Sequence, residues 1–238
     1  MKPNYGIDAP RVVATLFLLS LLLGIGAVLS FSIQTPLWFW LTFLYTISIA
    51  LTLFTMACWM LYGMKVAKPR IALQMIQRLA LQGHEKVLDL GCGRGLLLCK
   101  VAQYLPQGQA YGIDLWSSKD QSGNTIARTF ENAEREGVHE RIVIETGDVC
   151  LLPFPDQTFD AVVSSLCLHN LPTKLHREKA LLEMLRVLKP GGAFLIADIQ
   201  RSKEYADFLT AHGVSVVASK PIYAYCPPIC ILEGKSLS

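Results

Sequence analysis

The residues best suited to chemistry are an acidic side chain followed by three glycines at alternate positions, in Asp89-Leu90-Gly91-Cys92-Gly93-Arg94-Gly95. An apolar, strand-type segment precedes Asp89, and the helix-forming residues 96–102 follow. Glycine permits a turn with positive φ and lets a ligand approach the backbone, and the N–H groups at a helix start can face that ligand. A strand, a glycine-rich turn and a helix in this order are typical of a nucleotide-type site in a doubly wound α/β domain. We therefore expect Asp89, Gly91, Cys92, Gly93 and Gly95 to bind a cofactor.

Carboxylates also follow the next two predicted strands. Asp114 ends the second strand, and Gly147-Asp148-Val149 follows the third. Ligands of open α/β sheets lie beyond the carboxyl ends of the strands, where Asp114 can accept hydrogen bonds from both ribose hydroxyls of a nucleoside. Leu115 and Trp116 come next, and we expect an apolar or aromatic side chain there to pack on the adenine. An exposed loop aspartate is the alternative for Asp114.

A histidine follows the fourth predicted strand, in Ser164-Ser165-Leu166-Cys167-Leu168-His169-Asn170. Histidine can exchange a proton near physiological pH, so His169 is a candidate general base. The alternative is a structural histidine that packs over the cofactor or caps a helix. Asn170 is a candidate N-cap of the next helix, and Asn124 is a candidate N-cap of the helix expected at 125–136.

Three of these segments resemble motifs of class I S-adenosylmethionine-dependent methyltransferases, of the methyltransferase type 11 or type 25 kind. Residues 89–95 look like the first motif, residues 152–160 look like the segment before the fourth strand, and Arg186-Val187-Leu188-Lys189-Pro190-Gly191-Gly192 closely resembles a further block. The resemblance covers roughly residues 68–238. A Rossmann dehydrogenase is the alternative, but its turn is spaced Gly-x-Gly-x-x-Gly, and Leu96 stands where its last glycine belongs.

The resemblance implies S-adenosylmethionine as cofactor and a seven-stranded, Rossmann-like sheet. It implies that Asp148 accepts a hydrogen bond from the adenine amine and that Val149 lies near the base. It also implies that the end of the fourth strand, with Ser165 and Leu166, faces the sulfonium methyl and the methyl acceptor.

The last two predicted strands are linked by Tyr223-Ala224-Tyr225-Cys226-Pro227-Pro228. The prolines stiffen this link, so its tyrosines are placed either to line an acceptor pocket or to rest on a membrane surface. We expect His169, Asn170, Tyr223 and Tyr225 to bind the acceptor. The chain has seven cysteines and no Cys-x-x-Cys pair, so neither a disulfide framework nor a metal site is expected.

Alternating elements must position these residues. Strands are predicted at 86–90, 109–114, 141–146, 159–164, 193–198, 214–220 and 229–233, and helices at 68–82, 95–104, 125–136, 173–188 and 203–211. Such alternation predicts a mostly parallel, doubly wound sheet with helices on both faces. The last two strands lack a helix between them and should form an antiparallel hairpin at one edge. Residues 189–192 are expected to end a helix and turn.

Two long uncharged runs precede this domain. Residues 12–33 and 37–64 contain no charged side chain, and about 20 apolar residues suffice for a helix to cross the hydrocarbon core of a bilayer. Only Gln34-Thr35-Pro36 separates them, which predicts a transmembrane helical hairpin. Gly24, Gly26, Ala27 and Ser30 form a small-residue stripe where the helices can approach closely. A cleaved signal peptide and buried helices of a larger soluble core are the alternatives.

Basic residues flank the hairpin on one side only: Lys2 and Arg11 precede it, Lys65, Lys68 and Arg70 follow it, and none lies in the turn. The positive-inside rule then places both termini and the catalytic domain in the cytoplasm. The formal net charge of +3 is too small and too dispersed to indicate nucleic-acid binding.

These features together predict a membrane anchor over residues 1–67 and a methyltransferase domain over residues 68–238. The acceptor is expected at the cytoplasmic membrane surface, as a lipid, a quinone- or isoprenoid-like small molecule, or a membrane protein. A non-catalytic, cofactor-binding membrane scaffold is the alternative.

Overall fold

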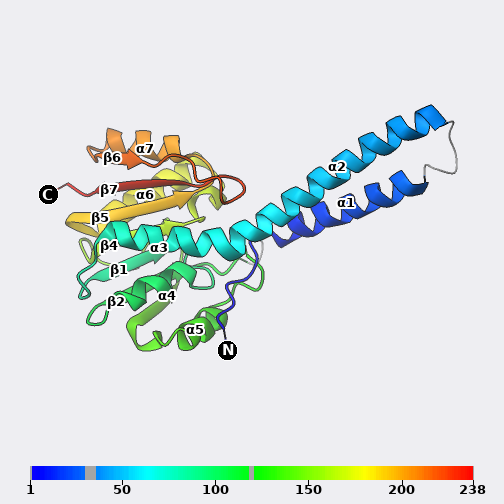
Figure 1. The fold of residues 1–238 in the computed structure, drawn as a ribbon. Helices are drawn as coiled ribbons and strands as arrows, with labels where there is room; N and C mark the ends of the chain where they lie inside the picture. The colour runs from blue at the N-terminus through cyan, green and yellow to red at the C-terminus, as the bar shows by residue number, and fades with distance from the viewer. Residues whose placement is uncertain (1, 30–35, 118–120, 238) are drawn as a thin grey trace.

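The computed structural model describes residues 2–29, 36–117 and 121–237. An α/β domain carries a long helical hairpin that projects from one side (Figure 1). The hairpin consists of α1 (Pro10–Leu29) and α2 (Pro36–Tyr62). A π-helical turn, η2 (Gly63–Ala67), joins α2 to α3 (Lys68–Leu79) without a break. The boundary predicted between residues 67 and 68 therefore falls inside a continuous helix.

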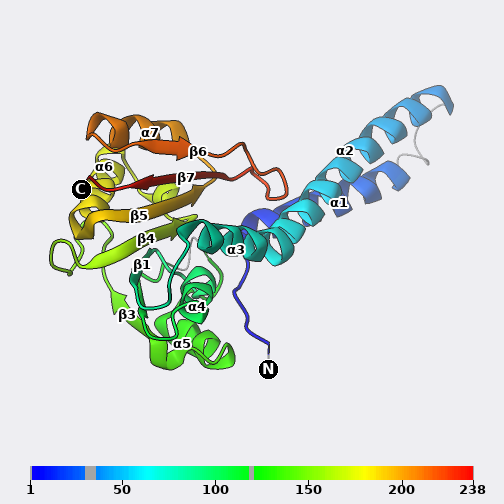
Figure 2. The same ribbon diagram turned by 60° about the vertical axis from the view of Figure 1, so that its left-hand side comes forward.

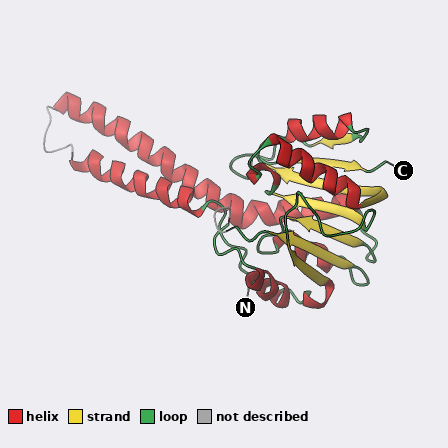
Figure 3. Ribbon diagram, turned by 180° about the vertical axis from the view of Figure 1, so that it is seen from behind, coloured by secondary structure: helices red, strands yellow, loops and turns green. Residues whose placement is uncertain are grey.

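The α/β domain is built on a seven-stranded sheet in the order β3-β2-β1-β4-β5-β7-β6. The strands are β1 (Lys86–Leu90), β2 (Gln109–Asp114), β3 (Ile142–Thr146), β4 (Phe159–Ser165), β5 (Leu188–Asp198), β6 (Val216–Ala218) and β7 (Cys230–Lys235). The first five pair in parallel, and β7 is antiparallel to both β5 and β6 (Figure 3). The predicted fold, including the antiparallel pair at one edge, is confirmed.

Helices cover both faces of this sheet because successive strand residues point to opposite sides. The helices α3, α4 and α5 lie on one face of the sheet and α6 and α7 on the other (Figure 2), and the adjacent residues Val87 and Leu88 of β1 belong to the separate buried clusters of these two faces. The helices are α4 (Leu96–Gln103), α5 (Ile126–Arg135), α6 (Lys174–Val187) and α7 (Ser202–Ala211). Both faces of the central strands β1 and β4 are apolar and largely buried, as is typical of parallel sheets.

The strand register brings the carboxyl ends of the central strands together. Leu90 at the end of β1 lies beside Ile113 of β2 and Ser164 of β4, and Ser164 lies beside Ile196 of β5. Short loops follow each of these ends, so the side chains that the sequence places there share one edge of the sheet.

Three local predictions were wrong. Thr125 and Thr173 are the N-caps of α5 and α6 through their hydroxyl oxygens, whereas Asn124 donates to the Asp114 carboxylate and Asn170 lies in a short 3₁₀ turn. In each case a threonine directly precedes the helix, and its hydroxyl oxygen caps the helix in place of the asparagine that we predicted. Residues 189–192 do not form a turn after α6, because β5 already begins at Leu188 and passes through them with a shift of register.

The hairpin helices carry apolar side chains that are mostly exposed. Both helices are long and apolar enough to cross a membrane, yet only 11% of the most apolar window of each is buried. Their contact is made by Ala27, which is buried, and by the Ser20 hydroxyl, which donates to the Ala50 carbonyl at 3.0 Å. A Cβ at Gly24 or Gly26 would meet nothing within 4 Å, so the close approach expected at these glycines was wrong. Gln34, Thr35 and Ser30 lie outside the described residues.

A buried arginine ties the helices of the second face to the loop after β4. Arg177 of α6 donates to both carboxylate oxygens of Glu204 at 2.7 and 3.2 Å, and to the Leu171 carbonyl at 3.2 Å. The guanidinium holds the pKa of Glu204 below its ordinary value. This contact therefore stabilises the loop that follows His169.

We predict that Arg177→Met lowers the free energy of unfolding by about 3 kcal/mol, because it leaves the Glu204 carboxylate without its partner. This stabilisation should be complete above the ordinary glutamate pKa of about 4.3 and be lost as the pH falls through the lower pKa of the folded state. Denaturant unfolding at several pH values measures both effects. The control is Arg128→Met, whose side chain is 52% exposed in its pair with Glu131, and which should cost less than about 1 kcal/mol. Equal effects of the two variants would contradict the prediction.

Candidate functional site

A cavity of about 430 Å³ opens at the carboxyl ends of β1, β2 and β4. It collects most of the residues that the sequence singled out, from five different loops and strand ends. These are Asp89, Gly91, Cys92, Gly93, Asp114, Leu115, Val149, Ser165, Leu166, His169, Asn170 and Tyr225.

Four predicted site residues do not line the cavity. Gly95 begins α4 with φ of +83°, and its backbone packs against Thr129. Trp116 turns away, and its indole N–H donates to the Thr146 hydroxyl at 2.8 Å. Gly95 therefore shapes the turn, and Trp116 closes the loop after β2.

The other two outliers are Asp148 and Tyr223. Asp148 is exposed and accepts a hydrogen bond from the Cys150 N–H at 2.8 Å, as expected for a residue that starts a turn. Tyr223 is 64% exposed, and its carbonyl accepts from the Trp59 indole at 3.1 Å. Tyr223 thus joins the loop before β7 to the hairpin, whereas Tyr225 turns into the cavity.

The glycine-rich turn is held to the neighbouring strand. The N–H groups of Gly91 and Cys92 both donate to the Ile113 carbonyl, at 2.9 and 3.1 Å. Gly91 has φ of +69°, and a Cβ there would overlap the Cys167 side chain. The turn therefore needs glycine at position 91 both for its backbone conformation and for the approach of the loop after β4.

We predict that Gly91→Ala weakens binding of S-adenosylhomocysteine, the demethylated cofactor, by roughly tenfold or more because the turn and the Cys167 loop must separate. Gly137→Ala is a matched control, since Gly137 has the same φ of +69° but open space around a Cβ. Both variants should lose similar stability from backbone strain, whereas Gly137→Ala should bind normally. Calorimetric titration with thermal unfolding separates the two effects, and equally weakened binding in both would contradict the clash.

The carboxylate of Asp114 organises the loops beside the glycine turn. One oxygen accepts from the Gly93 N–H at 2.8 Å, and the other from the Trp116 N–H at 2.6 Å and the Asn124 amide at 3.1 Å. An ionised carboxylate offers about four lone-pair positions. Three are occupied, so one ribose hydroxyl can bind directly, and a second needs one of these donors to move.

Asp89 is the most deeply buried of the acids that line the cavity, with 3% exposure. Burial, together with the neighbouring Asp114, raises its pKa well above the ordinary value. Its Oδ2 is buried without a hydrogen-bond partner. A buried acceptor without a donor is costly, so this atom is placed to receive a donor from a ligand.

His169 lies against a buried acid that the sequence did not indicate. The His169 Nδ1 is 2.5 Å from Oδ1 of Asp198, the last residue of β5, although the ring is not aligned for a regular hydrogen bond. The His169 backbone N–H also donates to the other oxygen of Asp198 at 3.0 Å. Asp198 is 1% exposed, whereas His169 lines the cavity. The contact leaves Nε2 as the ring nitrogen free for a ligand.

The sequence interpretation missed the part of the cavity wall that comes from the hairpin and its flanks. Asp8 and Ala9 precede α1, Met60 and Met64 end the second long helix, and Lys68 begins α3. Lys68 had been noted only for its charge at the membrane flank. Asp8 and Lys68 carry opposite charges and lie close to opposite ends of the hairpin. This was the signal in the sequence that the two flanks could meet.

The strand order and the glycine turn together define the class I methyltransferase fold. A structure of an S-adenosylmethionine-dependent methyltransferase from Aquifex aeolicus has this fold, with a TM-score of 0.57 and 19% identity over 70% of this chain and 89% of the other. Residues 88–196 match the family model described as a methyltransferase domain. This part of the chain is therefore similar to methyltransferase domains, and that similarity implies S-adenosylmethionine as the cofactor.

Two relatives share this domain. Methyltransferase GfsG of Streptomyces halstedii is 30% identical over 145 residues, which are 61% of this chain and 49% of that protein. Demethylmenaquinone methyltransferase of Symbiobacterium thermophilum is 31% identical over 126 residues, 52% of this chain and 46% of that protein. The chain spans about half the length of the curated relatives it matches.

The residues of the cavity fit this cofactor. Asp114 retains an acceptor position for a ribose hydroxyl, and Leu115 after β2 and Val149 after β3 supply apolar surface. The unpartnered oxygen of Asp89 can accept a hydrogen bond from an ammonium group. The glycine turn lets the backbone approach the ligand between these two ends.

Proposed function

We propose that this protein is a membrane-anchored methyltransferase that transfers a methyl group from S-adenosylmethionine to an acceptor at the cytoplasmic surface of a bilayer. The observation that carries the proposal is a shared wall: Met60 and Met64, at the end of the apolar hairpin, line the same cavity as the glycine turn and His169. An acceptor held in the bilayer beside the hairpin would thus reach the cofactor without leaving the membrane surface.

The exposed surface of the hairpin supports a membrane anchor over residues 1–67. Aromatic side chains near both ends of α2, such as Trp38 and Trp59, are exposed to 64% and 44%, as in an interfacial belt. Such large apolar surfaces are rare on soluble monomers. The basic residues on one flank favour a cytoplasmic catalytic domain at residues 68–238 and cytoplasmic termini.

The acceptor that best suits this geometry is a small amphipathic molecule of the lipid, quinone or isoprenoid kind. Apolar side chains of methionines, alanines and Pro227 line the hairpin side of the cavity, next to the ion pair of Asp8 and Lys68, whereas His169 and Asn170 line it from the loop after β4. An apolar tail would lie along the first group while a polar head meets the second. The relative named for demethylmenaquinone supports an acceptor of this class. A membrane-protein acceptor is the alternative that the test below distinguishes.

Each part of the cavity has a proposed role. The residues of the glycine turn, with Asp114, Leu115 and Val149, bind the cofactor, and Ser165 and Leu166 lie next to its methyl group. S-adenosylmethionine supplies an activated methyl on a positively charged sulfur. His169 would take the proton of the acceptor as the nucleophilic atom of the acceptor bonds to that methyl, while the methyl–sulfur bond breaks and its electron pair stays on the neutral sulfur of S-adenosylhomocysteine. Asn170 and Tyr225 border the acceptor, and Tyr223 rests on the membrane surface.

Methyl transfer into membranes tests this proposal. The full chain in nanodiscs is incubated with methyl-labelled S-adenosylmethionine and membranes of a strain that lacks the gene. We expect label in the lipid-extractable fraction. Label in precipitated protein instead would identify a membrane-protein acceptor. Cofactor binding without label in any fraction would overturn the enzymatic function in favour of a scaffold.

A further inference from the structure

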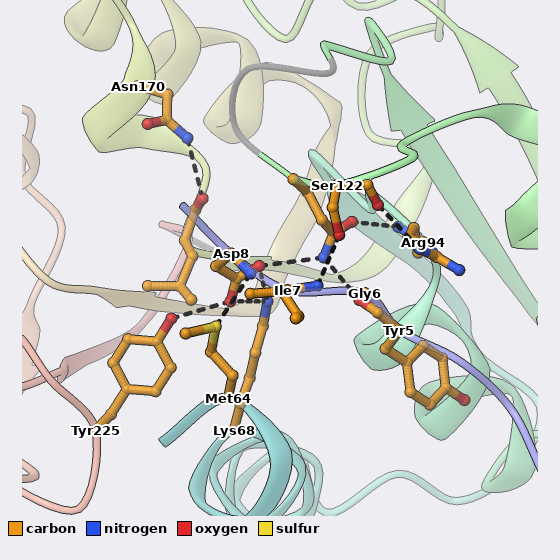
Figure 4. A network of polar contacts seen from close by, with 12 residues as sticks. Tyr5, Gly6, Ile7, Asp8, Met64, Lys68, Arg94, Ser122, Asn170 and Tyr225 are labelled. Carbon is orange, nitrogen blue, oxygen red and sulfur yellow. Dashed lines mark hydrogen bonds and ion pairs between the residues drawn. The ribbon is translucent and has the colours of Figure 1, made fainter. Parts of the chain in front are cut away.

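The segment before the hairpin is built into the α/β domain. Asn4 exchanges hydrogen bonds with the Asn132 side chain at 2.8 and 3.0 Å, and the Ile7 backbone exchanges two with Ser122 at 2.9 and 3.1 Å. The Tyr5 hydroxyl donates to a carboxylate on α5. Residues 4–8 therefore form a strap across the loop after β2, next to the glycine turn (Figure 4).

The strap places Asp8 beside the start of α3, where its carboxylate forms an ion pair with Lys68. The Lys68 ammonium lies 2.8 and 3.0 Å from the two carboxylate oxygens of Asp8. The Tyr225 hydroxyl and the Gln121 amide donate to the same carboxylate at 2.9 and 3.2 Å. Burial opposes ionisation of Asp8, but these partners outweigh it and hold its pKa below the ordinary value. An ionised acid and a base are thus fixed in the cavity wall (Figure 4).

A third charged group faces this pair. Asp89 lines the same cavity, its Oδ2 is buried without a partner, and the positive charge of Lys68 acts on its carboxyl group. Lys68 has three donor hydrogens, of which Asp8 needs at most two. This end of the cavity therefore offers acceptors for an ammonium group and a donor for a carboxylate.

The position of this cluster matches one end of the cofactor. Asp114 marks the nucleoside end, at the end of β2, and Asp8, Lys68 and Asp89 lie around the glycine turn at the end of β1. S-adenosylmethionine carries an α-amino acid at the end opposite to its adenosine. We propose that Lys68, held in place by Asp8, binds the carboxylate of this amino acid and that Asp89 binds its ammonium group. This inference rests on the proposed cofactor use.

The two flanks of the hairpin would then make one cofactor subsite. Asp8 lies two residues before α1, and Lys68 is the first residue of α3, immediately after the turn that ends the second long helix. A hairpin displaced from the domain would pull Asp8 away from Lys68. Cofactor affinity is therefore coupled to the docking of the hairpin.

A pair of ligands tests the subsite. S-adenosylhomocysteine carries the amino-acid end, whereas 5′-methylthioadenosine lacks it. In calorimetric titrations of the full chain in nanodiscs, Lys68→Met should weaken S-adenosylhomocysteine binding by about tenfold or more, since charged hydrogen bonds are lost. Asp8→Asn should act in the same direction. Binding of 5′-methylthioadenosine should stay within about twofold, which also reports that the variants are folded.

Lys65→Met is the matched control, because Lys65 precedes Lys68 by three residues, is exposed and does not line this cavity. It should leave both affinities unchanged. Equal weakening of both ligands by Lys68→Met, or no weakening of either, would overturn the subsite while leaving the cofactor assignment intact. Failure of the unaltered chain to bind either ligand would instead overturn the proposed function.

Discussion

Replacing Asp114 with alanine should weaken S-adenosylhomocysteine binding by at least about 100-fold, because a charged hydrogen bond to the ribose and the anchor of two loops are lost together. The carboxylate holds the Gly93 and Trp116 N–H groups and the Asn124 amide. Its removal leaves these donors without an acceptor at the point where the nucleoside must lie. Calorimetric titration of the full chain in nanodiscs measures the loss.

Asp207→Ala is the control, since Asp207 is an exposed aspartate on α7, away from the cavity. It should bind the ligand normally. Thermal unfolding shows whether Asp114→Ala remains folded, and a folded variant with unchanged affinity would contradict the assignment. Binding of NADH rather than S-adenosylhomocysteine by the unaltered chain would favour the dehydrogenase alternative.

The sequence predicted the sheet, and it placed the glycine turn and the acidic residues after β1 and β2 at one edge of that sheet, where they line one cavity, because local signals coincide there. Asp89 and Asp114 each end an apolar strand, and parallel strands bring such ends to one edge. The glycines after Asp89 report a backbone turn directly. The alternation of apolar residues, the glycines of the turn and the acidic residue at the strand end all indicate the same edge of the sheet. Predicting this part of the site therefore required little knowledge of contacts between distant segments.

The other half of the site depends on contacts between distant segments. Asp8 and Lys68 are separated by the whole hairpin and meet only because the strap packs against the loop after β2. Asp198 follows His169 by a complete helix and strand. No periodicity or short spacing encodes such pairs. Trp116 and Asp148 do follow the ends of strands, as predicted. Their side chains nevertheless make local contacts that direct them away from the cavity.

His169→Gln should lower kcat by about 10²–10⁴-fold if the acceptor must lose a proton during transfer, which is the range for a lost general base. Cofactor affinity should remain within about twofold, because binding contacts elsewhere in the cavity persist. His139→Gln is the control, as the His139 side chain is 57% exposed. Labelled methyl transfer to the identified acceptor measures kcat. Unchanged kcat in His169→Gln would mean that the acceptor needs no base.

Asp198 is expected to act through His169 as a positioning residue. Its carboxylate contacts Nδ1 and accepts hydrogen bonds from the His169 and Ile199 N–H groups, so it fixes which ring nitrogen faces the acceptor. Asp198→Asn should lower kcat by about 10- to 100-fold, because the amide no longer fixes the ring orientation, and it should leave the KM for the cofactor within about twofold. A merely structural role would lower the folded fraction and leave kcat per binding site unchanged. Because Asp198 is buried, the variant's affinity for S-adenosylhomocysteine serves as the measure of folded protein, and kcat is expressed per binding site.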